Sequence, residues 1–123
     1  MNFVFVGLGG GLGAMLRYAV SLLPWKRAFP LLTLCTNVLG AVLIGFIAGL
    51  AARRGLSQNA QLFFKTGLCG GFTTFSTFSL ESYTLIKAGQ KGTAVLYIAL
   101  SVGLCLLGIW LGHLAARRVF PLS

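Results

Sequence analysis

The residues best suited to chemistry lie in one short polar string, Gly70–Ser79, inside an otherwise apolar stretch. Two adjacent glycines weaken a helix, and serine and threonine hydroxyls compete for its backbone hydrogen bonds. In hydrocarbon, freed backbone groups are tolerated only where protein or a polar cavity covers them. The string therefore predicts a helix broken near the membrane midplane, whose exposed backbone ends can hold an ion. The alternative is a kinked helix whose hydroxyls bond back to its own carbonyls.

The string also carries candidate anion ligands. Phe75 and Phe78 are three residues apart, so they share a face where helix resumes after the break. Aromatic rings have positive edges, and Ser76 and Thr77 place hydroxyl groups beside them. Ring edges and hydroxyls together can hold a small anion. The alternative is that both rings face lipid or core.

Polar residues in two other apolar runs extend this set. Asn37 lies inside a long apolar run, where an unpaired amide is costly. It either bonds to a neighbouring helix or donates to an ion. Tyr97, Ser101 and Cys105 recur every four residues, which predicts one helical face bearing two hydroxyls and a thiol.

Two charged residues complete the candidates. Arg17 lies in the first apolar run, where a water-filled mouth would let it attract anions. Glu81 is the one acidic residue and follows the polar string by a short distance, so it can form an ion pair or a gate. His113 is expected at the membrane interface. Because the chain has neither a serine–histidine–acid set nor paired carboxylates, we expect no enzyme.

The elements that position these residues are membrane helices. The chain has 123 residues, of which 57% are hydrophobic and 9% charged, whereas soluble domains carry about 25% charged residues. A spanning helix needs about 20 apolar residues. The sequence predicts one all-α domain over residues 1–123, and its short loops make neighbouring helices antiparallel. The four spans are expected at about 3–23, 31–52, 60–88 and 93–116.

The net charge of +9 comes from short basic clusters between the apolar runs. This placement indicates anchoring at lipid headgroups rather than nucleic-acid binding. Orientation follows the excess of lysine and arginine on one side, and here there is none. The five basic residues expected on one side are Arg53, Arg54, Lys65, Arg117 and Arg118, and the five on the other are Arg17, Lys26, Arg27, Lys87 and Lys91.

This balance favours a chain that inserts both ways up. Two oppositely oriented copies then form an antiparallel dimer about an axis in the membrane plane. The alternative is that subtler signals select one orientation. Close helix packing is expected from glycines at four-residue spacing, within and between subunits. These glycines are Gly7, Gly9, Gly11, Gly13, Gly45, Gly49, Gly108 and Gly112.

The string at Gly70–Ser79, together with 11–18 (GLGAMLRY) and 33–40 (TLCTNVLG), resembles the Fluc (CrcB) family of fluoride channels along the whole chain. The resemblance implies an antiparallel homodimer of four-helix subunits in the cytoplasmic membrane of a prokaryote. It implies two pores that export fluoride passively and so lower its toxicity in the cell.

The resemblance also implies roles for individual residues. The backbone carbonyls of Gly70 and Thr73 match ligands of a structural Na⁺ at the dimer interface, which is not transported. Arg17 and Glu81 match a vestibule residue and a residue at the far end of the pore. Cys105 stands where a hydroxyl is expected. The residues matching the fluoride pathway are Asn37, Phe75, Ser76, Thr77, Phe78, Tyr97 and Ser101.

Two other classes of protein compete with a channel. A small multidrug-type exporter is also a short four-helix protein, but it needs a membrane-embedded carboxylate to exchange protons for substrate. The first apolar run here has none. A non-transporting assembly subunit is the second alternative, and it leaves the polar break without a purpose.

Overall fold

The computed structural model describes residues 2–121, and this part of the chain is all helical. Three helices are long and apolar enough to cross a membrane: α1 (Asn2–Ser21), α2 (Leu31–Arg54) and α6 (Lys91–Val119). The segment expected at 60–88 is built from successive pieces. These are α3 (Gln58–Gln61), the π-helix η1 (Leu62–Cys69), α4 (Gly70–Phe72) and α5 (Phe75–Lys87).

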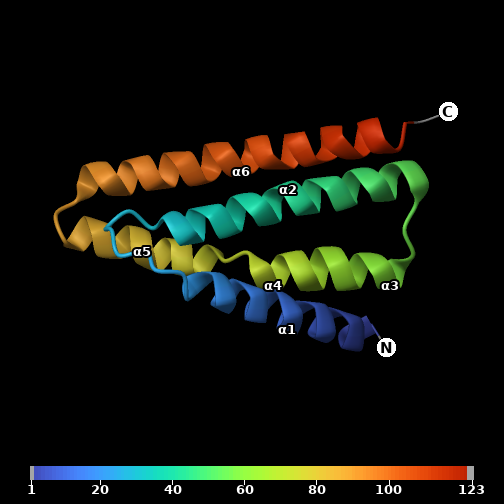
Figure 1. The fold of residues 1–123 in the computed structure, drawn as a ribbon, viewed down its shortest axis with the longest axis horizontal. Helices are drawn as coiled ribbons and strands as arrows, with labels where there is room; N and C mark the ends of the chain where they lie inside the picture. The colour runs from blue at the N-terminus through green and yellow to red at the C-terminus, as the bar shows by residue number, and fades with distance from the viewer. Residues whose placement is uncertain (1, 122–123) are drawn as a thin grey trace.

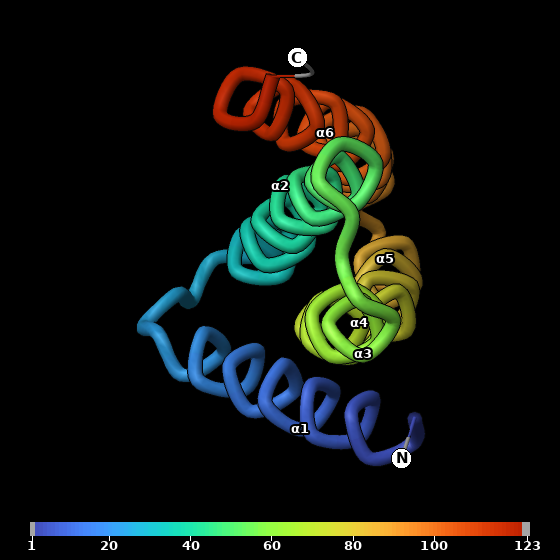
Figure 2. Tube along the Cα trace, turned by 90° about the vertical axis from the view of Figure 1, so that its right-hand side faces the viewer, coloured from blue at the N-terminus to red at the C-terminus, as the bar shows by residue number. Residues whose placement is uncertain are grey.

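The four segments run antiparallel to their chain neighbours, so the molecule has two distinct ends (Figure 1). One end holds both termini and the link between α2 and α3. The other holds the links from α1 to α2 and from α5 to α6. Seen from one end, α1 lies against the broken segment and α2 lies against α6 (Figure 2). These are also the two most extensive helix contacts.

Glycines bring α1 into backbone contact with the broken segment. A Cβ atom at Gly9 would collide with the Phe63 carbonyl, and one at Gly13 with the Leu68 carbonyl. On the facing side, a Cβ at Gly71 would collide with the carbonyl of Gly10. Small residues of this kind let lipid-embedded helices approach closely. The approach fixes the position of the segment just before the break.

A second glycine contact joins α2 to α6. A Cβ atom at Gly45 would collide with the carbonyl of Ile109, and one at Gly112 with that of Val42. At Gly7 and Gly11 on α1, in contrast, no atom of the described residues lies within 4 Å of the Cβ position. The predicted small-residue packing is therefore present within the chain for most of these glycines, and the face of α1 that carries Gly7 and Gly11 is open.

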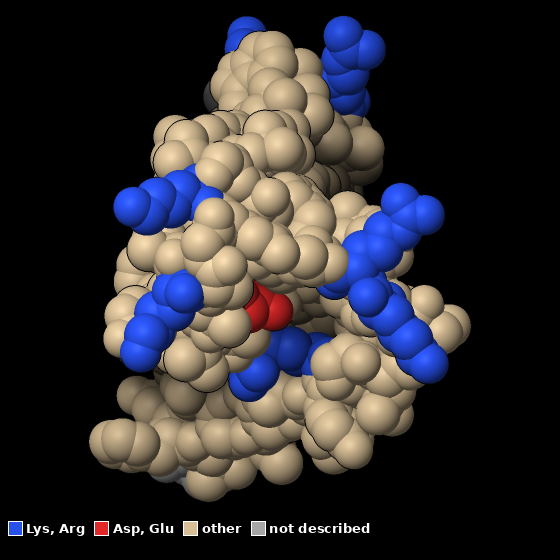
Figure 3. Space-filling model, turned by 90° about the vertical axis from the view of Figure 1, so that its left-hand side faces the viewer, with Lys and Arg blue, Asp and Glu red and all other residues tan. Residues whose placement is uncertain are grey.

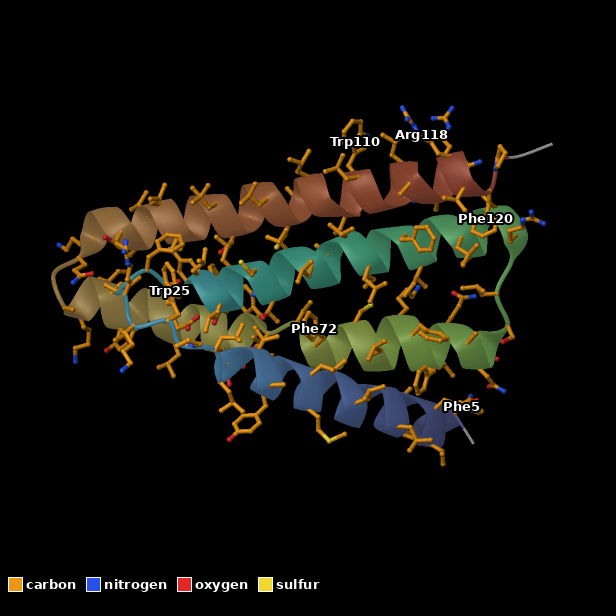
Figure 4. All side chains as sticks on the ribbon, viewed as in Figure 1. Phe5, Trp25, Phe72, Trp110, Arg118 and Phe120 are labelled. Atoms are coloured by element: carbon orange, nitrogen blue, oxygen red, sulfur yellow. The ribbon has the colours of Figure 1, made fainter. Side chains whose placement is uncertain are left out.

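Among the labelled aromatic side chains, Trp25 lies near one end of the molecule and Phe5 and Phe120 near the other, beside basic residues, while Phe72 and Trp110 lie between (Figure 4). At the end with Trp25, the Arg27 guanidinium lies 5.8 Å from the Trp25 ring centroid. At the opposite end, the Arg54 guanidinium lies 5.1 Å from the ring of Phe120. Between these ends the exposed side chains are mainly large and apolar. Apolar flanks between aromatic and basic belts are typical of a membrane protein.

Candidate ion pathway at the broken helix

The break lies at Thr73 and Thr74, both of which have extended backbone. Fifteen helical residues precede these two and thirteen follow them, so the interruption is near the middle of the segment. The Asn37 side chain bonds to both sides of the Thr74 backbone. Its Oδ1 accepts from the Thr74 N–H at 2.8 Å, and its Nδ2 donates to the Thr74 carbonyl at 3.1 Å. Asn37 therefore replaces the helical bonds that the break removes.

Thr74 also begins the second half of the segment. Its hydroxyl accepts from the backbone N–H of Thr77 at 3.1 Å, which is the usual bond of a helix N-cap. The preceding residue closes the first half. The Thr73 hydroxyl donates to the Cys69 carbonyl at 2.8 Å, and the Thr73 N–H donates to the same oxygen at 3.0 Å. Local side-chain bonds thus define both ends of the break.

Arg17 reaches the break from α1. Its Nε donates to the carbonyl of Gly71 at 3.1 Å, at the C-terminal end of α4. A cation is favourable at that end of a helix, where carbonyls lack helical partners. Arg17 also borders a small cavity of about 140 Å³, together with Thr33, Thr36 and Thr77. It therefore lies at a polar mouth and holds the broken backbone as well.

Bonds outside the regular helical ladder reach three carbonyl oxygens at the break: those of Cys69, Gly71 and Thr74. Within residues 2–121, none of them reaches the carbonyl oxygen of Gly70 or Thr73. Gly70 is exposed and Thr73 is partly buried. These two oxygens thus remain available to a cation or to a second chain.

Hydroxyls beyond the break do bond back to their own helix. The hydroxyls of Ser79, Ser82 and Thr84 each donate to the carbonyl four residues earlier, at 2.8 to 2.9 Å. The alternative of hydroxyls that bond back to the helix therefore describes α5 correctly. The Thr73 hydroxyl also bonds back, to the Cys69 carbonyl, but at Thr73 and Thr74 the helix is interrupted outright rather than kinked.

A groove of about 350 Å³ lies beside the break, between α2, α6 and the broken segment. The Phe75 and Phe78 rings stand 5.6 Å apart at its edge, and Phe75 is 80% exposed. The Ser101 hydroxyl is buried there and has no hydrogen-bond partner among residues 2–121. The lining residues are Asn37, Gly40, Ala41, Ile44, Cys69, Thr73, Thr74, Phe75, Phe78, Ser101, Val102, Cys105 and Ile109. The groove is mostly apolar and carries a few hydrogen-bonding groups.

Glu81 joins three helices beyond the groove. One carboxylate oxygen accepts from the Tyr97 hydroxyl at 2.8 Å, and the other accepts from the Thr33 hydroxyl at 2.9 Å. Tyr97 is fully buried and its ring packs on that of Phe78, with centroids 5.2 Å apart. The acidic side chain is recessed among basic ones in Figure 3. Two hydroxyl donors therefore stabilise this carboxylate.

The structure brings together most of the predicted pathway residues but not all of them. Asn37, Phe75, Phe78 and Ser101 line one groove, and Cys105 extends it. Tyr97 lies behind Phe78. The remaining residues, Arg17, Ser76, Thr77 and Glu81, lie outside this lining; Thr77 borders the Arg17 cavity, and Glu81 borders an opening of about 420 Å³ near the loop end.

Three features of the site are not among the predicted site residues: Thr33, Thr74 and the π-helix η1. Thr33 lies one helical turn before Asn37, and that spacing was the available signal for a shared polar face. Thr74 lies within the polar string, where several hydroxyl residues could equally cap the following helix. π-Helical turns are rare, and those that occur are often at functional sites. No side-chain pattern in residues 62–69 predicts one.

Comparison with known proteins identifies the family. Residues 4–113 match the family described as CrcB-like protein, Camphor Resistance (CrcB). The chain belongs to the CrcB family. This membership agrees with the resemblance based on the polar string. Together with the long apolar helices, it identifies a multi-pass membrane protein. The family consists of ion channels rather than enzymes.

Curated relatives within the CrcB family bear the name Fluoride-specific ion channel FluC. The protein of Roseiflexus sp. is 45% identical over 98% of this chain and 100% of its own length. The protein of Azobacteroides pseudotrichonymphae is 44% identical over 89% and 90%, respectively. That of Rhodospirillum rubrum is 43% identical over 94% and 95%. The similarity therefore includes every helix that borders the break.

Proposed function

We propose that this chain is a fluoride-selective channel that lets fluoride leave the cell passively through the groove beside the broken helix. The observation that carries the proposal is the groove itself, which Phe75, Phe78 and Ser101 line together. The name of the curated relatives supports fluoride as the permeant ion.

The chemistry of the groove suits a small, strongly hydrated anion. A selective pore must replace the ion's water without binding it so tightly that it stalls. Hydroxyl groups and positive ring edges are donors of moderate strength. The amide oxygen and nitrogen of Asn37 are both bonded to the Thr74 backbone. Asn37 is therefore expected to hold the break in place as well as to contact the ion. Tyr97 and Ser101 continue the path along α6, with Ser76 and Thr77 beside the break.

The functional unit in this proposal is an antiparallel homodimer with two pores. The equal basic clusters at the two ends support insertion in both orientations. The open face of α1 carries Gly7 and Gly11, whose lack of side chains would let another helix approach closely. The expected location is the cytoplasmic membrane of a prokaryote, where fluoride export lowers the cytoplasmic concentration.

A structural sodium ion belongs to the same proposal. The carbonyls of Gly70 and Thr73 fit this ion, because hard oxygen ligands suit a hard cation and neither oxygen accepts one of the bonds at the break. Two copies would supply four such oxygens. Bound there, the ion would offset part of the cost of bringing an anion into hydrocarbon.

The direct test is fluoride efflux from liposomes. The purified protein is reconstituted with potassium fluoride inside and low potassium outside, valinomycin is added, and an electrode follows external fluoride. We expect efflux that requires valinomycin, because a channel moves net charge, and far slower efflux when chloride replaces fluoride. Fluoride efflux equal to that of protein-free liposomes, or equal rates for chloride, would overturn the proposal.

A further inference from the structure

The link between α1 and α2 places one aromatic side chain against the buried core. Residues 22–28 of this link are exposed except for Trp25, whereas the Phe29 that follows them is partly buried. Phe29 packs against a buried cluster that includes Tyr97. Phe78, which lines the groove beside the break, packs against the same cluster. A residue of the link and a residue of the proposed pathway therefore share their packing partners.

Local hydrogen bonds hold the backbone of Phe29. Its carbonyl accepts from the Trp25 indole N–H at 2.7 Å and from the Leu31 backbone N–H at 2.8 Å. The second bond spans Pro30, whose φ of −79° and ψ of 68° are those of an inverse γ-turn. Because both bonds come from residues close in the sequence, the link itself fixes the point from which the Phe29 ring extends.

Phe29 is connected to Phe78 through one ring, that of Tyr97. The Phe29 and Tyr97 rings form a T-shaped pair, with centroids 5.6 Å apart and planes at 78°. The Tyr97 and Phe78 rings are tilted by 56°, with centroids 5.2 Å apart. Aromatic pairs at such distances attract each other beyond the effect of their buried area. The three rings thus form a row that leads from the link, across α6, to the groove.

Tyr97 is the fixed member of this row. It is fully buried, and its hydroxyl donates to the Glu81 carboxylate at 2.8 Å. Close-packed interiors transmit a displacement rather than absorb it. On the groove side, the neighbour of Phe78 is Phe75, which is largely exposed and leaves Phe78 room to turn. The orientation of the Phe78 ring is therefore set from the side of Tyr97.

We propose that Phe29 is a positioning residue for the ion pathway, because it holds Tyr97 and thereby fixes the angle at which the Phe78 ring meets the groove. This angle matters because a ring attracts an anion at its edge and repels it at its face. Loss of the Phe29 ring leaves space beside Tyr97 into which both other rings can shift. The effect on ion flow rests on the proposed function, whereas the coupling of Phe29 to Phe78 does not.

The coupling is tested by ¹⁹F NMR in detergent, with 4-fluorophenylalanine in place of Phe78. Phe29→Leu keeps apolar bulk but removes the ring. Phe63→Leu is the matched control, because Phe63 is also partly buried and forms a T-shaped pair, with Phe64, but does not line the groove. We expect Phe29→Leu to shift and broaden the fluorine signal and the control to leave it unchanged. An unchanged signal in Phe29→Leu, or equal changes in both variants, would refute the coupling.

Liposome efflux of the unlabelled variants tests the consequence for ion flow. Phe29→Leu should slow fluoride efflux about fivefold, as expected for the loss of one aromatic pair. Phe29→Tyr, which keeps a ring, and Phe63→Leu should both conduct like the wild type. Wild-type efflux in Phe29→Leu, or equal losses in Phe29→Leu and Phe29→Tyr, would overturn the role of this ring in ion flow. If the unsubstituted protein passes no fluoride, the proposed function fails, while the fluorine signal still decides the coupling.

Discussion

Single polar side chains stabilise the interrupted backbone near the middle of the broken segment. Asn37 bonds to the N–H and the carbonyl of Thr74, and Arg17 bonds to the Gly71 carbonyl. Each of these contacts comes from a different helix, α2 or α1. The break is thus a built feature with its own hydrogen-bond partners, and its residues can be tested one at a time.

Replacing Asn37 by alanine should remove both of its hydrogen bonds to the Thr74 backbone. The substitution leaves the N–H and the carbonyl of Thr74 without partners, at a cost of about 1 kcal/mol for each of these partly buried groups. We expect a lower melting temperature in detergent and fluoride efflux reduced at least tenfold. Asn59→Ala is the matched control, since Asn59 is exposed on α3. If the Asn37 variant melts and conducts like the wild type, these two hydrogen bonds do not stabilise the break.

The phenylalanine pair can be tested without disturbing the break. Phe75→Ile and Phe78→Ile keep apolar bulk but remove the positive ring edges. Each should reduce fluoride efflux at least tenfold while the protein elutes as the wild type on size exclusion. Phe3→Ile provides the control, because Phe3 is 92% exposed near the N-terminus. If the pair variants conduct like the control, the rings do not take part in permeation.

Glycine contacts decide how the helices pack. α1 meets η1 and α4 through Gly9, Gly13 and Gly71, and α2 meets α6 through Gly45 and Gly112. In each case the nearest atoms belong to backbone, which cannot move aside as a flexible side chain can. Any added methyl group must therefore separate two whole helices, including those that form the groove walls.

Gly112→Ala tests this packing on α6. The new methyl would collide with the carbonyl of Val42, so α2 and α6 would have to separate. We expect a lower melting temperature and poor recovery of monodisperse protein. Gly103→Ala on the same helix is the control, because nothing lies within 4 Å of its Cβ position. Equal stability of the two variants would show that the α2–α6 contact tolerates separation.

Basic residues are balanced over the whole molecule. Arg17 is bonded to the break and Lys65 lies within η1, so neither sits in a loop. Without these two, each end still carries four basic residues. The balance therefore does not depend on which end Arg17 and Lys65 are assigned to. It favours insertion in both orientations, as the proposed antiparallel dimer requires.

Adding charge to one end should upset this balance. Two lysines at Ala88 and Gln90, beside the α5–α6 link, should bias insertion to one orientation and lower fluoride efflux severalfold. Adding two more at Gln58 and Asn59, at the opposite end, should restore the balance and the efflux. Accessibility of cysteines placed in each loop measures orientation. Full efflux from a chain with one orientation would argue against an obligatory antiparallel dimer.

The sequence by itself determined the helices and the place of the break. Apolar runs separated by basic clusters can be recognised as membrane helices from the length of a membrane span alone. The observed bounds lie within a few residues of the expected ones. The interruption fell within Gly70–Ser79 because glycine and hydroxyl residues weaken a helix locally. These are properties of neighbouring residues, so one sequence carries them.

Only the tertiary structure decided which distant residues meet. The contacts of Asn37 with Thr74, Arg17 with Gly71, and Glu81 with Tyr97 depend on how helices cross. The crossing depends on which glycines face which backbone. It also placed Cys69 and Cys105 in one groove, although 36 positions separate them in the sequence. No local pattern encodes such meetings, because they result from the close packing of separate segments.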